Sequence, residues 1–121
     1  MTMVSVSEHL PPQLDGCVSV VRQWLDKITA ASTNPDLDLR NLRAVLIHLL
    51  EIVERDSAID AAVDSLADAA SAYLKEVELG AGMQTKAGDR AVARRLNTLE
   101  LAFAALRRSL ATAKPRPGVL W

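Results

Sequence analysis

Apolar residues recur along most of this chain at alternating spacings of four and three, as they do on one face of an α-helix. From about residue 12 to residue 32, this face carries Leu14, Val18, Val21, Leu25 and Ile28. A second stretch repeats the pattern with Leu39, Leu42, Leu46, Leu49 and Val53. The spacing therefore predicts two amphipathic helices in the first half of the chain.

Two further stretches have the same period. The third helix is predicted from about residue 57 to residue 79, with its apolar seam at Ile59, Val63, Leu66, Ala70, Tyr73 and Val77. The fourth is predicted from residue 89 to about residue 113, with its seam at Val92, Leu96, Leu99, Phe103, Leu106 and Leu110. Such seams pack against one another between nearly antiparallel axes. We predict an all-α fold, an antiparallel four-helix bundle.

Proline, glycine and capping residues mark the expected connections. Pro11 and Pro12 suit the opening of the first helix. The segment STNPDLD is predicted to be a loop, after which Asp36 or Asp38 caps the second helix. Residues 80–88 form the other connection, with Gly80 ending one helix and Asp89 capping the next. The chain then divides into an N-terminal tail (1–11), one bundle domain (12–113) and a C-terminal tail (114–121).

The boundary between the second and third helices lacks glycine and proline. Ser57 with Asp60 three residues later resembles a capping box, and the two apolar seams differ in phase, so we predict a break. The alternative is one fused helix of some forty residues that buries its faces in an intertwined dimer.

Composition restricts the chemistry that is open to the chain. Cys17 is the single cysteine, so an intrachain disulfide and a cysteine-based zinc site are excluded. The sequence has no Glu-x-x-His pair of the kind that carboxylate-bridged metal bundles use. We expect no metal, no cofactor and no catalytic residue. Because no apolar run approaches the roughly 20 residues that span a bilayer, we expect a soluble, cytoplasmic protein with no membrane contact.

Charge is unevenly distributed along the sequence. Residues 1–85 hold 6 Lys/Arg against 13 Asp/Glu, whereas residues 86–121 hold 8 against 2. The acidic half includes Asp56, Asp60, Asp64 and Asp68, a row that recurs every four residues on the third helix.

An antiparallel fourth helix would bring basic residues beside those carboxylates. We expect Arg107 and Arg108 near the start of the third helix, and Arg90 and Arg94 near Glu76 and Glu78. A rival interpretation is a nucleic-acid-binding face, which would consist of Arg90, Arg94, Arg95, Arg107, Arg108 and Arg116.

His48 is the histidine that lies within a predicted helix. At 100° per residue its side chain lies about 200° from Leu46, so we expect it to be exposed. Ile47 extends apolar character beyond the seam, and we interpret Ile47 and His48 as a partner-binding patch. An exposed helical histidine resembles that of histidine phosphotransfer domains, and Arg43 with His48 resembles the R-x4-6-H motif of HEPN-type ribonucleases. Either resemblance would imply phosphotransfer or ribonuclease activity centred on His48.

The ending KPRPGVLW places Val119, Leu120 and Trp121 after two prolines. We expect these three residues to fold back onto the bundle or to dock on a partner. The resulting hypothesis is a non-enzymatic helical interaction protein, such as an adaptor, assembly factor or regulator. It would bind another protein, or itself as a homodimer, through bundle faces and the tail.

Overall fold

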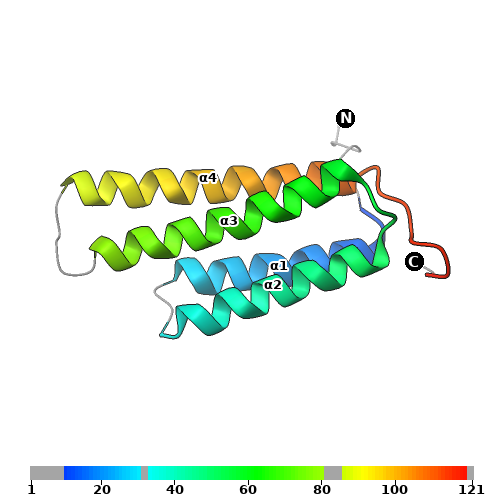
Figure 1. Cartoon of the computed structure of the whole chain (residues 1–121), viewed down its shortest axis with the longest axis horizontal. Coiled ribbons are helices and arrows are strands. Elements are labelled where there is room, and N and C mark those ends of the chain that lie inside the picture. The colour runs from blue at the N-terminus through cyan, green and yellow to red at the C-terminus, as the bar shows by residue number, and fades with distance from the viewer. Residues whose placement is uncertain (1–9, 31–32, 81–85, 120–121) are drawn as a thin grey trace, which may run out of the picture.

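The computed structural model describes residues 10–30, 33–80 and 86–119, and this part of the chain contains four α-helices. They are α1 (Pro12–Thr29), α2 (Pro35–Ile52), α3 (Ser57–Gly80) and α4 (Lys86–Leu110). Consecutive helices run antiparallel (Figure 1). The predicted all-α antiparallel four-helix bundle is confirmed.

The bundle consists of two helical hairpins packed side by side. α1 pairs with α2 and α3 pairs with α4, while α2 also contacts α3 and α1 also contacts α4 (Figure 1). All five predicted seam residues of the first helix are buried, as are Leu42, Leu46 and Leu49 in α2. Leu66, Leu99 and Leu106 are completely or almost completely buried on the second hairpin. One aliphatic core therefore joins the hairpins, as the periodicity predicted.

Two predicted seam residues are exposed. Val77 of α3 is 39% exposed and Leu96 of α4 is 36% exposed. Val77 lies three residues before the end of α3, whereas Leu96 lies ten residues after the start of α4. The sequence identified the correct face of each helix, but the neighbouring helices do not cover that face evenly along its length.

α2 and α3 are separate helices, so the fused-helix alternative is wrong. α2 ends at Ile52, and Val53 adopts an extended backbone conformation. The carboxylate of Asp56 then accepts hydrogen bonds from the N–H groups of Ala58 at 2.7 Å and Ile59 at 3.4 Å. Asp56 is therefore the N-cap of α3, one residue before the predicted Ser57. Asp60 does not complete a capping box, because its carboxylate accepts a hydrogen bond from Arg55 at 2.8 Å.

Other helix ends also differ from the prediction by a few residues. Asn34 caps α2 by accepting the N–H of Leu37 at 3.2 Å, in place of the predicted Asp36 or Asp38. The reason is that Pro35 occupies the first helical turn, where its fixed φ is already suitable and its missing N–H costs nothing. α1 ends at Thr29, three residues before the predicted Ser32.

α4 is displaced toward the N-terminus relative to its predicted range. It begins at Lys86, three residues before the expected cap Asp89, and it ends at Leu110. The first turn accommodates Gly88, so this glycine does not mark a connection. Gly80 is the last residue of α3, and the rest of the predicted connection up to residue 85 lies outside the described part of the chain.

The chain after α4 returns to the junction between α2 and α3 (Figure 1). The N–H of Glu54 donates to the carbonyl of Lys114 at 2.7 Å, and the N–H of Arg116 donates to the carbonyl of Ile52 at 3.1 Å. These bonds form an isolated antiparallel bridge between Val53 and Pro115. We call residues 114–119 the C-terminal strap.

Candidate functional site

A groove between α2 and α3 combines an exposed apolar residue with charged walls. Its lining has an apolar part, formed by Leu46, Leu50, Val63 and Ala67, and it encloses about 390 Å³. Ile47 on the α2 wall is 59% exposed. We call this feature the α2–α3 groove. An apolar hollow with a projecting isoleucine can accept apolar side chains from another molecule.

The groove is more acidic on one wall than on the other. Asp64 and Asp68 line it from α3, while Arg43 lines it from α2. Within the described residues these three side chains form no ion pair, and all three are exposed. The α3 wall therefore offers two carboxylates to an incoming cation.

The predicted row of four aspartates thus divides into two pairs with different surroundings. Asp56 and Asp60 are used locally, as the cap of α3 and as the partner of Arg55. Asp64 and Asp68 remain available in the groove. Sequence reasoning treated all four as partners of basic residues on α4, because spacing alone does not show which carboxylates are used within their own turn.

The ion pairing between α3 and α4 involves different residues from those predicted. Arg95, and neither Arg90 nor Arg94, lies 3.5 Å from the carboxylate of Glu76. At the other end, Nε of Arg107 is buried without a hydrogen-bond partner in the described structure, although its helix end lies beside the start of α3 (Figure 1). The antiparallel arrangement of α3 and α4 was predicted correctly. The rotation of α4 about its own axis, which turns Arg95 toward Glu76, was not predicted.

The six residues of the proposed basic face do not share one surface. Arg90, Arg94 and Arg108 are exposed and form no ion pair within the described residues. Their spacing places them on the outward side of α4, on the same stripe as Leu101, which is 62% exposed. The other three are otherwise engaged or partly covered: Arg95 pairs with Glu76, Arg107 is half-buried, and Arg116 binds α2 carbonyls.

Arg22 makes the best-defined ionic contact of the bundle. Its guanidinium donates to both carboxylate oxygens of Glu100 on α4, at 2.7 and 2.9 Å, and to Asp26 on its own helix. It also lies over the ring of Phe103, 5.2 Å from the centroid. The hydrogen bond from Arg22 lowers the pKa of Glu100. This contact ties α1 to α4 and is structural.

His48 is exposed, as the helical wheel predicted. Its side chain is 62% exposed, and Nδ1 lies 3.8 Å from the carboxylate of Glu51. It lines a shallow hollow between α1 and α2, together with Cys17 and Val20. Arg43 lines the α2–α3 groove on the other side of α2. The two residues of the ribonuclease-like motif therefore do not face one common phosphate position.

Cys17 is the other reactive side chain in the α1–α2 hollow. The thiol is half-buried and free, and burial raises its pKa. A raised pKa keeps the thiol protonated at neutral pH, whereas a nucleophilic cysteine needs the thiolate. Burial of Cys17 therefore disfavours the thiolate form.

The C-terminal strap is held by its own bundle. Val119 is half-buried against the core. Arg116 donates through Nη2 to the carbonyl of Leu50 at 2.7 Å and through Nε to that of Val53 at 3.4 Å. Leu120 and Trp121, the other predicted partner-binding residues of the tail, lie outside the described residues.

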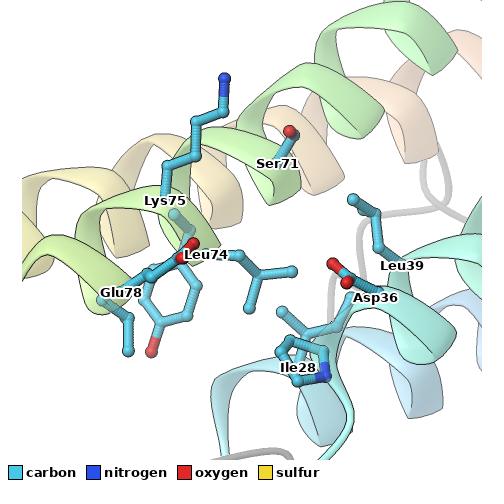
Figure 2. Close-up of a pocket in the computed structure, with 10 residues that line it drawn as sticks. Ile28, Asp36, Leu39, Ser71, Leu74, Lys75 and Glu78 are labelled. Carbon is cyan, nitrogen blue, oxygen red and sulfur yellow. The ribbon is translucent and has the colours of Figure 1, made fainter. Parts of the chain in front are cut away.

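A second pocket lies where the longer hairpin extends past the shorter one. Ile28, Asp36 and Leu39 line it from the first hairpin, and residues of α3 from Ser71 to Glu78 line it from the second (Figure 2). Its volume is about 390 Å³. The sequence contained one indication of this pocket, because the third and fourth apolar seams are longer than the first two. Periodicity alone does not show which parts of a longer seam stay uncovered.

No protein-family model, curated protein or solved structure matches this chain significantly. In the described part of the chain, no cluster of three or more His, Cys, Asp or Glu side chains is placed to hold a metal ion. None of the described helices is long and apolar enough to cross a membrane.

Proposed function

We propose that this chain is a helical protein-binding module, an adaptor, assembly factor or regulator, that holds a helix of another protein in the α2–α3 groove. The observation that carries the proposal is Ile47, which is 59% exposed beside an apolar hollow. Large apolar side chains exposed at a hollow are typical of surfaces that bind protein. A partner helix laid between α2 and α3 would cover Ile47 and fill the hollow.

The charges of the groove define the partner. Asp64 and Asp68 on the α3 wall favour Lys or Arg on the side of the partner that faces α3. The single cation on the other wall, Arg43, favours an acidic or neutral residue there. We therefore expect an amphipathic helix with an apolar stripe and basic residues along one flank, a helix-in-groove mode of recognition.

A displayed library of helical peptides tests this proposal. The full chain should enrich peptides that carry apolar residues at i, i+3 or i+4 and i+7, with Lys or Arg beside them. Ile47→Asp should abolish enrichment. Leu37→Asp is the matched control, because Leu37 is an exposed leucine of α2 outside the groove and should leave enrichment unchanged.

Binding of one enriched peptide, measured by fluorescence anisotropy, then tests the charges. Asp64→Asn with Asp68→Asn should weaken binding about tenfold, which corresponds to roughly 1.4 kcal/mol. Amide chemical shifts should change at Ile47, Val63 and Ala67. The proposal is wrong if the Ile47→Asp chain enriches the same peptides, or if the shifts cluster elsewhere.

A second candidate function rests on Arg90, Arg94 and Arg108. Because they are exposed and unpaired in the described structure and lie on one outward stripe of α4, they support nucleic-acid binding. Affinity for a double-stranded oligonucleotide should then fall steeply with salt, and Arg94→Gln should reduce the salt slope by about one. Binding that is absent or insensitive to salt would exclude this candidate.

A further inference from the structure

Tyr73 of α3 is a buried tyrosine whose hydroxyl has no hydrogen-bond partner within the described residues. The residue is 8% exposed, and its hydroxyl oxygen is not sealed inside the core. Buried phenol groups usually find a partner, because burial removes most of the water that would otherwise bind them. Tyr73 lines the pocket between α3 and the first hairpin, which we call the end pocket. A molecule that enters this pocket therefore meets a polar group that the protein itself does not use.

The end pocket has apolar walls and the volume of a small-molecule site. It encloses about 390 Å³, within the range of roughly 300–1,000 Å³ that is typical of ligand pockets. Leu74 of α3 points toward Ile28 of α1 across it (Figure 2), and Leu39 lines it from α2. Leu39 and Leu74 are half-buried. An apolar group bound here would remove the uncovered parts of these side chains from water, which favours binding.

The charged groups that face the end pocket are both negative. Figure 2 shows the carboxylates of Asp36 and Glu78 on either side of Leu74, whereas the ammonium of Lys75 extends away from the pocket. Asp36 belongs to the first turn of α2 and Glu78 to the last turn of α3. Neither carboxylate forms an ion pair within the described residues. The potential at the mouth of the pocket therefore favours a cation.

We propose that the end pocket binds a small organic amine, with its ammonium group at Asp36 and Glu78 and its apolar body against Leu74. An ammonium has hydrogen-bond donors and no acceptor, so it suits a pocket whose polar groups are two carboxylates and the oxygen of Tyr73, all of which accept. An organic acid of the same size would be repelled by the two carboxylates. A neutral apolar molecule would leave both of them without a partner.

This site is separate from the α2–α3 groove, because the two hollows share no lining residue. The amine site therefore goes beyond the proposed function, and either proposal can fail without the other. It also gives the two carboxylates a role that the fold does not require, since neither forms an ion pair with a described residue.

Titration of the full chain with 2-phenylethylamine, followed by amide chemical shifts, tests the proposal. Concentrations up to about 10 mM cover dissociation constants of roughly 1 mM or tighter. The shifts should saturate and should be largest at Ile28, Leu39 and Leu74. Two matched compounds separate the contributions: 2-phenylethanol has the same apolar body without the charge, and ethylamine has the charge without the ring. Each should bind at least about tenfold more weakly than 2-phenylethylamine.

Paired substitutions then test the two carboxylates. Asp36→Asn with Glu78→Gln should weaken the binding of 2-phenylethylamine at least about tenfold. Asp64→Asn with Asp68→Asn is the matched control, because it removes the same net charge from the α2–α3 groove and leaves the end pocket intact. This control should bind the amine with the affinity of the parent chain.

Tyr73→Phe separates a role in binding from a role in folding. The substitution keeps the ring and removes a hydroxyl without a partner in the described structure, so the thermal midpoint of the free chain should not fall. The affinity for 2-phenylethylamine should fall about tenfold, because a hydrogen bond to a charged group is lost. The proposal is overturned by shifts that fail to appear or that cluster elsewhere, by equal affinity for 2-phenylethanol, or by unchanged affinity in either end-pocket variant. A lower midpoint of the free Tyr73→Phe chain would also overturn it.

Discussion

The guanidinium of Arg116 donates a hydrogen bond to the main-chain carbonyl of Leu50, 66 residues earlier in the chain. A second bond runs from its Nε to the carbonyl of Val53, and its own N–H binds the carbonyl of Ile52. The last turn of α2 contains no basic residue, so the cation that complements its negative end comes from the strap.

Replacing Arg116 should destabilise the bundle. Arg116→Ala removes charged hydrogen bonds from the carbonyls of Leu50 and Val53, so we expect a loss of about 1–3 kcal/mol in the free energy of unfolding. Arg116→Lys should restore only part of this, because an ammonium does not reproduce the forked guanidinium geometry. Urea denaturation measures both changes. Arg108→Ala, which removes an exposed arginine without an ion pair in the described structure, should cost less than about 0.5 kcal/mol.

The N-cap of α3 can be tested by comparing the stability of substitutions at two adjacent residues, Asp56 and Ser57. Asp56→Ala removes the carboxylate that binds the free N–H groups of Ala58 and Ile59, and we expect it to cost about 1 kcal/mol. Ser57→Ala lies one residue inside the helix and should be nearly neutral. Equal losses of thermal stability in the two variants would contradict the assignment of Asp56 as the cap.

Stability should depend on pH through Glu100. The hydrogen bond from Arg22 lowers the pKa of Glu100 in the folded state. The stabilising contribution is therefore fully present above the unfolded-state pKa of about 4.3 and is lost as pH falls through the lower folded-state value. Denaturant midpoints from pH 6 to pH 2 should fall less steeply for Glu100→Gln than for the parent chain. A slope in Glu100→Gln equal to that of the parent chain would contradict this coupling.

Two leucines of α4 should respond very differently to truncation. Leu99 is almost completely buried in the core, so Leu99→Ala should cost about 2–5 kcal/mol. Leu101 is 62% exposed, and Leu101→Ala should change stability by less than about 0.5 kcal/mol. If thermal denaturation showed similar losses in both, the rotation of α4 described here would be incorrect.

The helices and the core were predictable because they follow from local periodicity. Leu14, Val21 and Leu25 form one face of any regular helix through that stretch, whatever surrounds it. The exposure of His48 followed from the same geometry and was confirmed. Periodicity shows which side of a helix is apolar, and the four apolar faces were sufficient to predict a four-helix bundle.

Features that depend on the length or path of other segments could not be predicted in this way. Val77 and Leu96 match their seams, and only the packed structure shows that they are 39% and 36% exposed. Arg116 seemed equivalent to the other arginines because nothing near it in sequence indicates that the strap returns to Leu50. The caps were displaced because several residues in a row, such as Asp56 and Ser57, can accept the same N–H groups.

The C-terminal strap also affects the order in which parts of the chain can fold during translation. A ribosome makes the carbonyl of Leu50 long before it makes the guanidinium of Arg116, so the end of α2 emerges without its cation. The first hairpin can form early, since its contacts are local. The junction between α2 and α3 reaches its final hydrogen bonding only after translation has passed residue 116.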